Sequence, residues 1–201
     1  MKYAVLDVET TGFQPSDEII QIGLVLIEAG VIRSRFTSLV KPSRVELPEA
    51  IKRLTGIDES MLEGAPELEE VIPQVLPFLH DAALVAHNAA FDLGFLQRAL
   101  DRCGYSPFSG RVLDTMDFLR ILFPGLPSLE LSTAAATLGV AHERAHRADS
   151  DALATAHLWL MCLEKLDRLP LITVQRLAHL FDQPPAYLED LSWFFREYRF
   201  E

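Results

Sequence analysis

The first forty residues limit the possible folds more than any other part of the sequence. Residues 3–8, Glu18–Ile27 and Val31–Val40 are three runs rich in β-branched and apolar side chains, and Glu28-Ala29-Gly30 separates the last two. A short connection containing glycine between two such runs is typical of a β-hairpin. The sequence therefore predicts that the chain begins with an antiparallel meander of strands.

The pattern then changes to helices and single short strands. Apolar spacing predicts helices over Pro48–Leu54 and Glu67–Leu79, and Pro73 and Pro77 are expected to kink or split the second. A meander followed by strand–helix units predicts an α/β fold around one mixed sheet. Two further strands are predicted at Ala83–Ala86 and Val112–Asp114. The other predicted helices are Asn88–Arg102, a helix that follows the second of these strands and ends at Phe123, Leu129–Leu138 before a capping Gly139, and Ala148–Lys165.

Four carboxylates lie in separated patches of this pattern. Asp7 and Glu9 are two residues apart in the first strand, so their side chains share one face of the sheet. Two acids on one face of an apolar strand are costly unless they are paired or bound to a metal. Asp92 lies in the first turns of one predicted helix and Asp151 in those of another. A fold that gathers the four would form an all-oxygen site, which Mg²⁺ or Mn²⁺ prefers.

Three patches of the sequence contain these carboxylates: Asp7-Val8-Glu9-Thr10-Thr11-Gly12, His87-Asn88-Ala89-Ala90-Phe91-Asp92 and His146-Arg147-Ala148-Asp149-Ser150-Asp151. They resemble the motifs of the DEDDh (DnaQ-like) group of 3′–5′ exonucleases, which includes the proofreading epsilon subunit of bacterial DNA polymerase III. The likeness covers residues 3–165 and is closest to the N-terminal exonuclease domain of DinG-type helicases, on His146–Ala152 and Leu169–Thr173. It implies the ribonuclease H-like exonuclease fold, a mixed central sheet flanked by helices.

The resemblance implies a metal-dependent enzyme that hydrolyses single-stranded nucleic acid from its 3′ end to nucleoside 5′-monophosphates by a two-metal mechanism. His146 would take the proton of the attacking water, because an imidazole exchanges protons near neutral pH. The carboxylates expected to hold two Mg²⁺ or Mn²⁺ ions are Asp7, Glu9, Asp92 and Asp151, and the residues expected to contact the substrate are Thr10, Thr11, Asn88 and Phe91.

Some polar residues near the motifs have structural explanations. His87 and Asn88 precede a helix, where a polar side chain caps free N–H groups, so capping or orientation is expected of His87. Asp114 is predicted to be an N-cap or a support outside the metal site. Asp149 is predicted to be a favourable charge at a helix N-terminus.

Parts of the sequence are compatible with two other functions. His142-Glu143-Arg144-Ala145-His146 matches H-E-x-x-H, the pattern of zinc hydrolases, but that site needs both histidines on one helix face, and these lie between two predicted helices. A catalytically lapsed nucleic-acid-binding or recruitment module is the other alternative. Such modules usually lose an acidic ligand, whereas this chain retains four acidic residues and His146. The exonuclease is therefore favoured.

Composition limits the class of nucleic-acid partner and the cellular compartment. The net charge of −11 argues against a tight, sequence-specific DNA binder, since phosphate neutralisation supplies the affinity of proteins that coat duplex DNA. An exonuclease that holds a few nucleotides through cations is compatible with this acidity. No apolar run could span a bilayer, and Cys103 and Cys162 have no metal-type spacing, so a cytoplasmic protein with reduced thiols is expected.

The sequence also suggests where the catalytic domain ends. Residues 1–168 are predicted to form the exonuclease domain and residues 169–201 a C-terminal helical extension. That extension either packs on the domain's own core or leads to another domain, such as a helicase, and a polymerase partner is also open. Its aromatic residues are Tyr187, Trp193, Phe194, Phe195, Tyr198 and Phe200.

Overall fold

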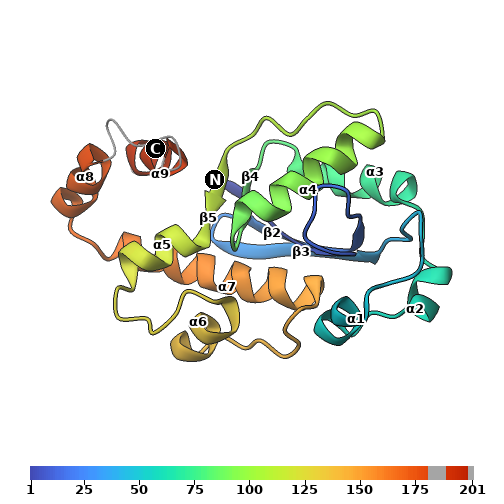
Figure 1. Cartoon of the computed structure of the whole chain (residues 1–201). Helices are drawn as coiled ribbons and strands as arrows, with labels where there is room; N and C mark the ends of the chain where they lie inside the picture. Colours follow the sequence, from blue (N-terminus) through green and yellow to red (C-terminus); the bar gives the residue numbers. More distant parts are fainter. Residues whose placement is uncertain (181–188, 199–201) are drawn as a thin grey trace.

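A computed structural model describes residues 1–180 and 189–198 of the chain. In this part, one mixed sheet has the strand order β3-β2-β1-β4-β5 (Figure 1). The meander consists of β1 (Lys2–Thr10), β2 (Ile19–Glu28) and β3 (Val31–Leu39), which pair antiparallel. The strands β4 (Ala83–Ala86) and β5 (Val112–Asp114) continue the sheet parallel to β1. The predicted α/β fold with a mixed sheet is confirmed.

Helices cover both faces of the sheet (Figure 1). The helices α3 and α4 lie on one face, and α7 lies along the other beside α5 and α6. The short α2 was not predicted; Asp58 caps it by accepting a hydrogen bond from the Met61 N–H. The helices are α1 (Glu49–Thr55), α2 (Glu59–Glu63), α3 (Leu68–Leu79), α4 (Ala89–Arg102), α5 (Thr115–Leu122), α6 (Leu131–Leu138), α7 (Ala148–Asp167), α8 (Leu171–Leu180) and α9 (Glu189–Glu197).

The central strand β1 contributes to both apolar layers. Its even-numbered residues from Ala4 to Val8 pack with α3 and α4. Tyr3 and Val5 point to the opposite face and pack in the cluster that contains Trp159 of α7. Alternation along a strand therefore assigns each β1 side chain to a layer. On the α7 face the apolar residues end at Val5, and Asp7 and Glu9 follow.

The prolines of α3 do not split that helix, in contrast to one of the expected outcomes. Pro73 and Pro77 are exposed, whereas Val71, Ile72 and Val75 are buried. The backbone groups that the prolines leave without helical partners therefore lie on the solvent side, where water can satisfy them. The start of the helix is also well closed, because Glu67 and Glu70 form a capping box.

The described part of the aromatic C-terminal segment packs on the chain's own core. Phe194 of α9 lies 4.8 Å from Phe118 and 5.5 Å from Trp159 between ring centroids, and Phe194 and Phe195 are buried. Tyr187 and Phe200 lie outside the described residues. The division of the chain at residue 168 stays a prediction. In the described ranges no helix has the length and apolar character needed to cross a membrane.

Candidate metal centre

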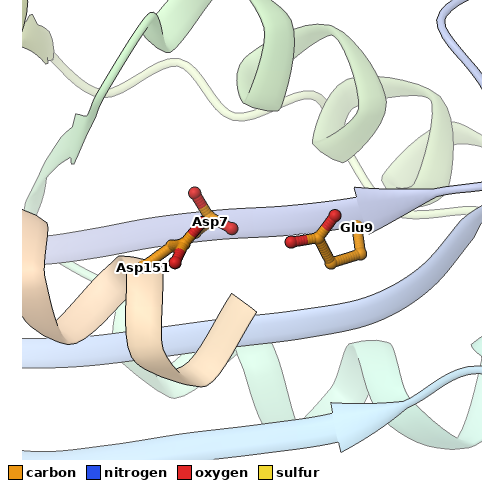
Figure 2. Close-up of side chains that lie close together, drawn as sticks. All are labelled: Asp7, Glu9 and Asp151. Carbon is orange, nitrogen blue, oxygen red and sulfur yellow. The ribbon is translucent and has the colours of Figure 1, made fainter. Parts of the chain in front are cut away.

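Three carboxylates meet between β1 and the first turns of α7 (Figure 2). Asp7 and Glu9 point from one face of β1, and Asp151 points toward them from α7. One oxygen of each lies within 4.8 Å of the others. Glu9 and Asp151 are each 8% exposed, so these carboxylates are largely removed from bulk water. Asp151 is far from Asp7 and Glu9 in the sequence, so the fold brings the three together.

Two residues of β2 determine how closely α7 approaches the sheet. A Cβ on Gly23 would lie 2.0 Å from the Ala148 carbonyl oxygen, so any other residue there would displace the start of α7. Gly23 is the β2 partner of Asp7. The Gln21 side-chain oxygen accepts hydrogen bonds from the Ala148 N–H at 3.2 Å and from Arg147 Nε at 3.1 Å. These contacts place the first turn of α7 opposite Asp7 and Glu9.

Burial and the neighbouring negative charges raise the pKa values of Asp7 and Glu9. Burial raises the pKa of Asp7 well above its ordinary value, and the charges of Asp92, Asp151 and Glu9 raise it further. Burial, with the charge of Asp151, raises the pKa of Glu9 to about 7, although Arg147 opposes this shift. The ionised group is therefore unfavourable without a cation, as is usual where carboxylates share a buried site.

Asp92 lies beside this group without joining it. One of its oxygens accepts a hydrogen bond from the Val8 N–H of β1 at 3.0 Å. Burial raises the pKa of Asp92, and the hydrogen bond from Val8 works in the opposite direction. The structure thus brings together three of the four carboxylates expected to bind metal. A role for Asp92 as the fourth ligand stays a prediction.

Two histidines of the loop before α7 contact Asp151, one through its ring and the other through its backbone. His142 Nε2 lies 2.6 Å from Asp151 Oδ1, and the His146 backbone N–H donates to Asp151 Oδ2 at 3.1 Å. His146 itself is exposed and has a left-handed backbone, with φ of 60°. The base expected from the sequence therefore lies at the rim of the group. The contact of His142 with Asp151 was missed, although the H-E-x-x-H pattern had singled that residue out for different chemistry.

The zinc-hydrolase pattern does not have its required geometry. Residues 140–147 form the loop between α6 and α7, so His142 and His146 do not share a helix face. The set of His, Cys, Asp and Glu residues close enough to hold a metal in the described part of the chain is Asp7, Glu9 and Asp151. The pattern match thus arises from a loop sequence.

The second motif is organised by Asp114. Its carboxylate accepts hydrogen bonds from the backbone N–H groups of Asn88, Ala89 and Met116, at 3.1, 2.9 and 2.9 Å. It therefore caps α5 and the start of α4, which corrects the expectation that His87 or Asn88 provides a cap. The His87 ring instead lies 2.8 Å from Thr115 Oγ1 and 2.6 Å from the Leu129 carbonyl oxygen. Asn88 is exposed, with a left-handed φ of 71°.

The predicted substrate residues occupy the turn after β1 and the nearby face of α4. Thr10 Oγ1 donates to the Gly12 carbonyl, and Thr11 Oγ1 donates to Asp17 and accepts from the Glu18 N–H, so both hydroxyls hold the turn. Phe13 follows that turn and is 70% exposed, and its ring centroid is 6.2 Å from that of Phe91. Phe13 was not among the predicted residues, although its position directly after Thr-Thr-Gly could have indicated it.

The donor set fits a divalent metal ion. Asp7, Glu9 and Asp151 offer oxygen atoms within 4.8 Å of one another, and Mg²⁺ and Mn²⁺ prefer oxygen ligands. Burial and the neighbouring carboxylates make ionisation of Asp7 unfavourable, and the positive charge of a bound cation would offset this cost. The residues present are therefore suitable for such a cation.

The sheet order and the position of these carboxylates define the class of ribonuclease H-like exonucleases. Exonuclease X in complex with 5′ overhanging duplex DNA superimposes with a TM-score of 0.66 at 26% identity, covering 83% of this chain and 94% of that one. E. coli Exonuclease I in complex with a dT13 oligonucleotide has a TM-score of 0.74 at 20% identity, covering 83% of this chain and 42% of its own. The second likeness concerns the fold alone.

The family follows from the sequence matches. The exonuclease family model matches residues 4–159, and the chain therefore belongs to the exonuclease family. It is also 41% identical over 193 residues to the 3′–5′ exonuclease DinG of Bacillus subtilis (strain 168), a match that covers 95% of this chain. The chain spans about a fifth of the length of the curated relatives that it matches.

Proposed function

We propose that this chain is a metal-dependent 3′–5′ exonuclease that hydrolyses single-stranded nucleic acid to nucleoside 5′-monophosphates. The observation that carries the proposal is the meeting of Asp7, Glu9 and Asp151 at the end of the central strand. The similarity to 3′–5′ exonuclease DinG supports the direction of attack, and the likeness to Exonuclease I with its dT13 oligonucleotide suits a single strand. The substrate is a 3′ end, which a helicase domain or a polymerase partner would present.

The metal requirement is part of the proposal. Asp7, Glu9 and Asp151, with Asp92 as a fourth ligand, would hold two Mg²⁺ or Mn²⁺ ions. Such ions supply positive charge that stabilises the phosphate during attack and acidifies water. Glu9 and Asp7 would also help to place the terminal phosphate, because a bound substrate would share the cations that these carboxylates hold. A zinc site formed by His142, Glu143 and His146 is not needed for this chemistry.

His146 is proposed to take the proton from the attacking water. The oxygen of that water forms a bond to phosphorus. The bond to the 3′-oxygen of the preceding nucleotide breaks, and this oxygen takes a proton from solvent. The products are a nucleoside 5′-monophosphate and a strand with a new 3′-hydroxyl. The exposed position of His146 at the rim of the group suits this exchange with solvent.

The terminal base is proposed to lie against Phe13 and Phe91. Phe13 is exposed, and its ring lies beside that of Phe91. Phe13 directly follows the first carboxylate motif, and Phe91 directly precedes Asp92. Stacking on an aromatic ring accepts any base, which agrees with degradation that does not depend on sequence. Thr10, Thr11 and Asn88 would contact the sugar and phosphate.

A cytoplasmic location is also part of the proposal. The free thiols of Cys103 and Cys162 agree with it.

An end-labelled oligonucleotide tests the proposal. We expect immediate release of a labelled mononucleotide from 3′-labelled strand with Mn²⁺, slow shortening of 5′-labelled strand, and no reaction with EDTA. Stable binding without cleavage would instead support a lapsed recruitment module. Glu143→Gln serves to test the zinc alternative, because a zinc hydrolase would lose activity and the proposed exonuclease would not.

A second variant tests the proposed base. We expect His146→Ala to lower turnover by about 10²–10⁴-fold, the usual contribution of a general base. Its affinity for Mn²⁺ should remain that of the unchanged chain, since the His146 contact with Asp151 is made by the backbone. Full turnover in this variant would exclude His146 as the base.

A further inference from the structure

His142 connects α6 to the carboxylate group through both of its ring nitrogens. Nε2 lies 2.6 Å from Asp151 Oδ1, and Nδ1 lies 3.3 Å from the hydroxyl oxygen of Ser132 in α6. The His142 side chain is 6% exposed. The ring is therefore largely removed from solvent.

The partners determine what each ring nitrogen does. An ionised carboxylate accepts hydrogen bonds and cannot donate, so the hydrogen between His142 and Asp151 lies on Nε2. In the neutral ring Nδ1 is then an acceptor, and the Ser132 hydroxyl donates to it. A histidine that is held at one nitrogen and donates from the other has a fixed ring orientation.

This arrangement leaves Asp151 with one committed site on each oxygen. His142 donates to Oδ1 and the His146 N–H donates to Oδ2. A carboxylate has about four acceptor sites, so each oxygen keeps one for a cation. With both oxygens held, the Asp151 carboxylate cannot rotate freely about its own axis, and its free sites stay directed toward Asp7 and Glu9.

We propose that His142 is a positioning residue that holds the Asp151 carboxylate ready for a divalent cation, and that Ser132 fixes the ring of His142 for this purpose. The inference rests on the proposed metal-dependent function and adds residues of α6 and the following loop to it. The two histidines of the loop thereby have different tasks: His142 acts through Asp151, whereas the exposed His146 is available to the attacking water. Partners of this kind typically change metal affinity by about 10–100-fold when removed.

The test compares His142→Gln with His142→Met in the full chain. The two side chains have similar length, but the glutamine amide can donate a hydrogen bond to Asp151 and the methionine sulfur cannot. Mn²⁺ binding is measured without nucleic acid, from the electron paramagnetic resonance signal of free Mn²⁺. We expect His142→Met to weaken binding by about 10–100-fold, His142→Gln to keep most of the affinity, and Ser132→Ala to lie between them.

Glu143→Gln is the matched control, because Glu143 is exposed in the same loop and should leave Mn²⁺ binding unchanged. Melting curves in EDTA establish that each variant folds, and His142→Ala replaces His142→Met if methionine overpacks the site. Turnover provides a further distinction. High Mn²⁺ should restore turnover in His142→Met, with an unchanged KM for the strand, whereas His146→Ala should not respond.

Three outcomes would overturn the inference. Mn²⁺ affinity in His142→Met equal to that of the unchanged chain would remove the positioning role. The same would follow if His142→Gln and His142→Met were equally weak binders, or if His142→Met lost turnover that no Mn²⁺ concentration restored. Failure of the unchanged chain to bind Mn²⁺, or tight binding by Asp7→Asn, would instead contradict the proposed function itself.

Discussion

The two halves of one strand face differ completely in chemistry. On the side of β1 that faces α7, Tyr3 and Val5 are buried with Trp159, whose ring centroid is 5.2 Å from that of Tyr3. Farther along the same face, Asp7 and Glu9 meet Asp151 from the first turns of α7. The same strand and the same helix thus form an apolar core at one end and an acidic group at the other.

The difference shows how stability and function are divided within this layer. An aromatic ring buries some 150–250 Å² of surface, so the aromatic end favours folding. The acidic end opposes folding, since burial and mutual repulsion raise the pKa values of Asp7 and Glu9. The packing of Trp159 therefore supports a site that the carboxylates alone would not stabilise. Changes at the two ends should have opposite effects on stability.

The largest effect is expected at the acidic end. Asp7→Asn removes a proposed ligand, and we expect turnover to fall by about 10⁴-fold, equivalent to about 5.5 kcal/mol of activation free energy. In EDTA the variant should unfold at the same or a higher temperature, because one buried charge is gone. Release of label from a 3′-labelled strand and calorimetry check the two expectations. A loss of turnover that only accompanies unfolding would break the contrast between the ends.

The aromatic end should show the reverse. Trp159→Ala removes a fully buried side chain and should lower the free energy of unfolding by about 3–5 kcal/mol, measured with urea. Mn²⁺ affinity of the folded fraction should change little. Trp159→Phe is the milder comparison: it keeps most of the ring packing and removes an Nε1 donor that has no hydrogen-bond partner among the described residues. Equal losses in both variants would contradict an origin in packing.

The sequence predicted the fold well where the signals are local. The β-branched, apolar runs of β1 and β2, the glycine after α6 and the capping Asp114 are all signals within a few residues. Gly139 indeed ends α6 with a left-handed φ of 74°. The five-residue α2 was missed, because a single helical turn carries too few apolar positions to show a period.

The parts of the site that escaped prediction depend on contacts between distant segments. Gly23 is needed because α7 approaches β2 closely, and nothing within β2 itself reveals that approach. Gln21 interrupts an apolar run, but this interruption does not identify Ala148 as its partner. The contact between His142 and Asp151 depends on a loop with a left-handed residue at His146, a conformation that the sequence alone did not indicate.

A pH series sharpens the comparison further. The pKa of Glu9 is about 7 in the folded chain, against 4.5 for an ordinary glutamate. Between these values the folded state holds a proton that the unfolded state has released, so metal-free stability should fall as pH rises from about 4.5 to 7. The expected loss from Glu9 is roughly 3 kcal/mol. Urea unfolding in EDTA at pH 4 and 8 measures it.

Glu9→Gln is the control for that series. The variant should lose much of the pH dependence and be more stable than the unchanged chain at pH 8. With Mn²⁺ the trend should reverse, because cations bind the ionised carboxylates. Identical pH dependence in Glu9→Gln and the unchanged chain would show that Glu9 does not carry the buried charge assigned to it.

The smallest effect concerns an aromatic residue that is not in the core. Phe13 is 70% exposed, so Phe13→Ala should change the free energy of unfolding by less than about 0.5 kcal/mol, in contrast to Trp159. If its ring receives the terminal base, KM for a single strand should rise roughly tenfold, since stacking contributes about 1–3 kcal/mol for each base. Val31→Ala is the matched control, because Val31 is an exposed apolar residue paired with Glu28 at the opposite end of the sheet. An unchanged KM in Phe13→Ala, or an equal rise in Val31→Ala, would remove Phe13 from the substrate site and leave Phe91 as the aromatic candidate.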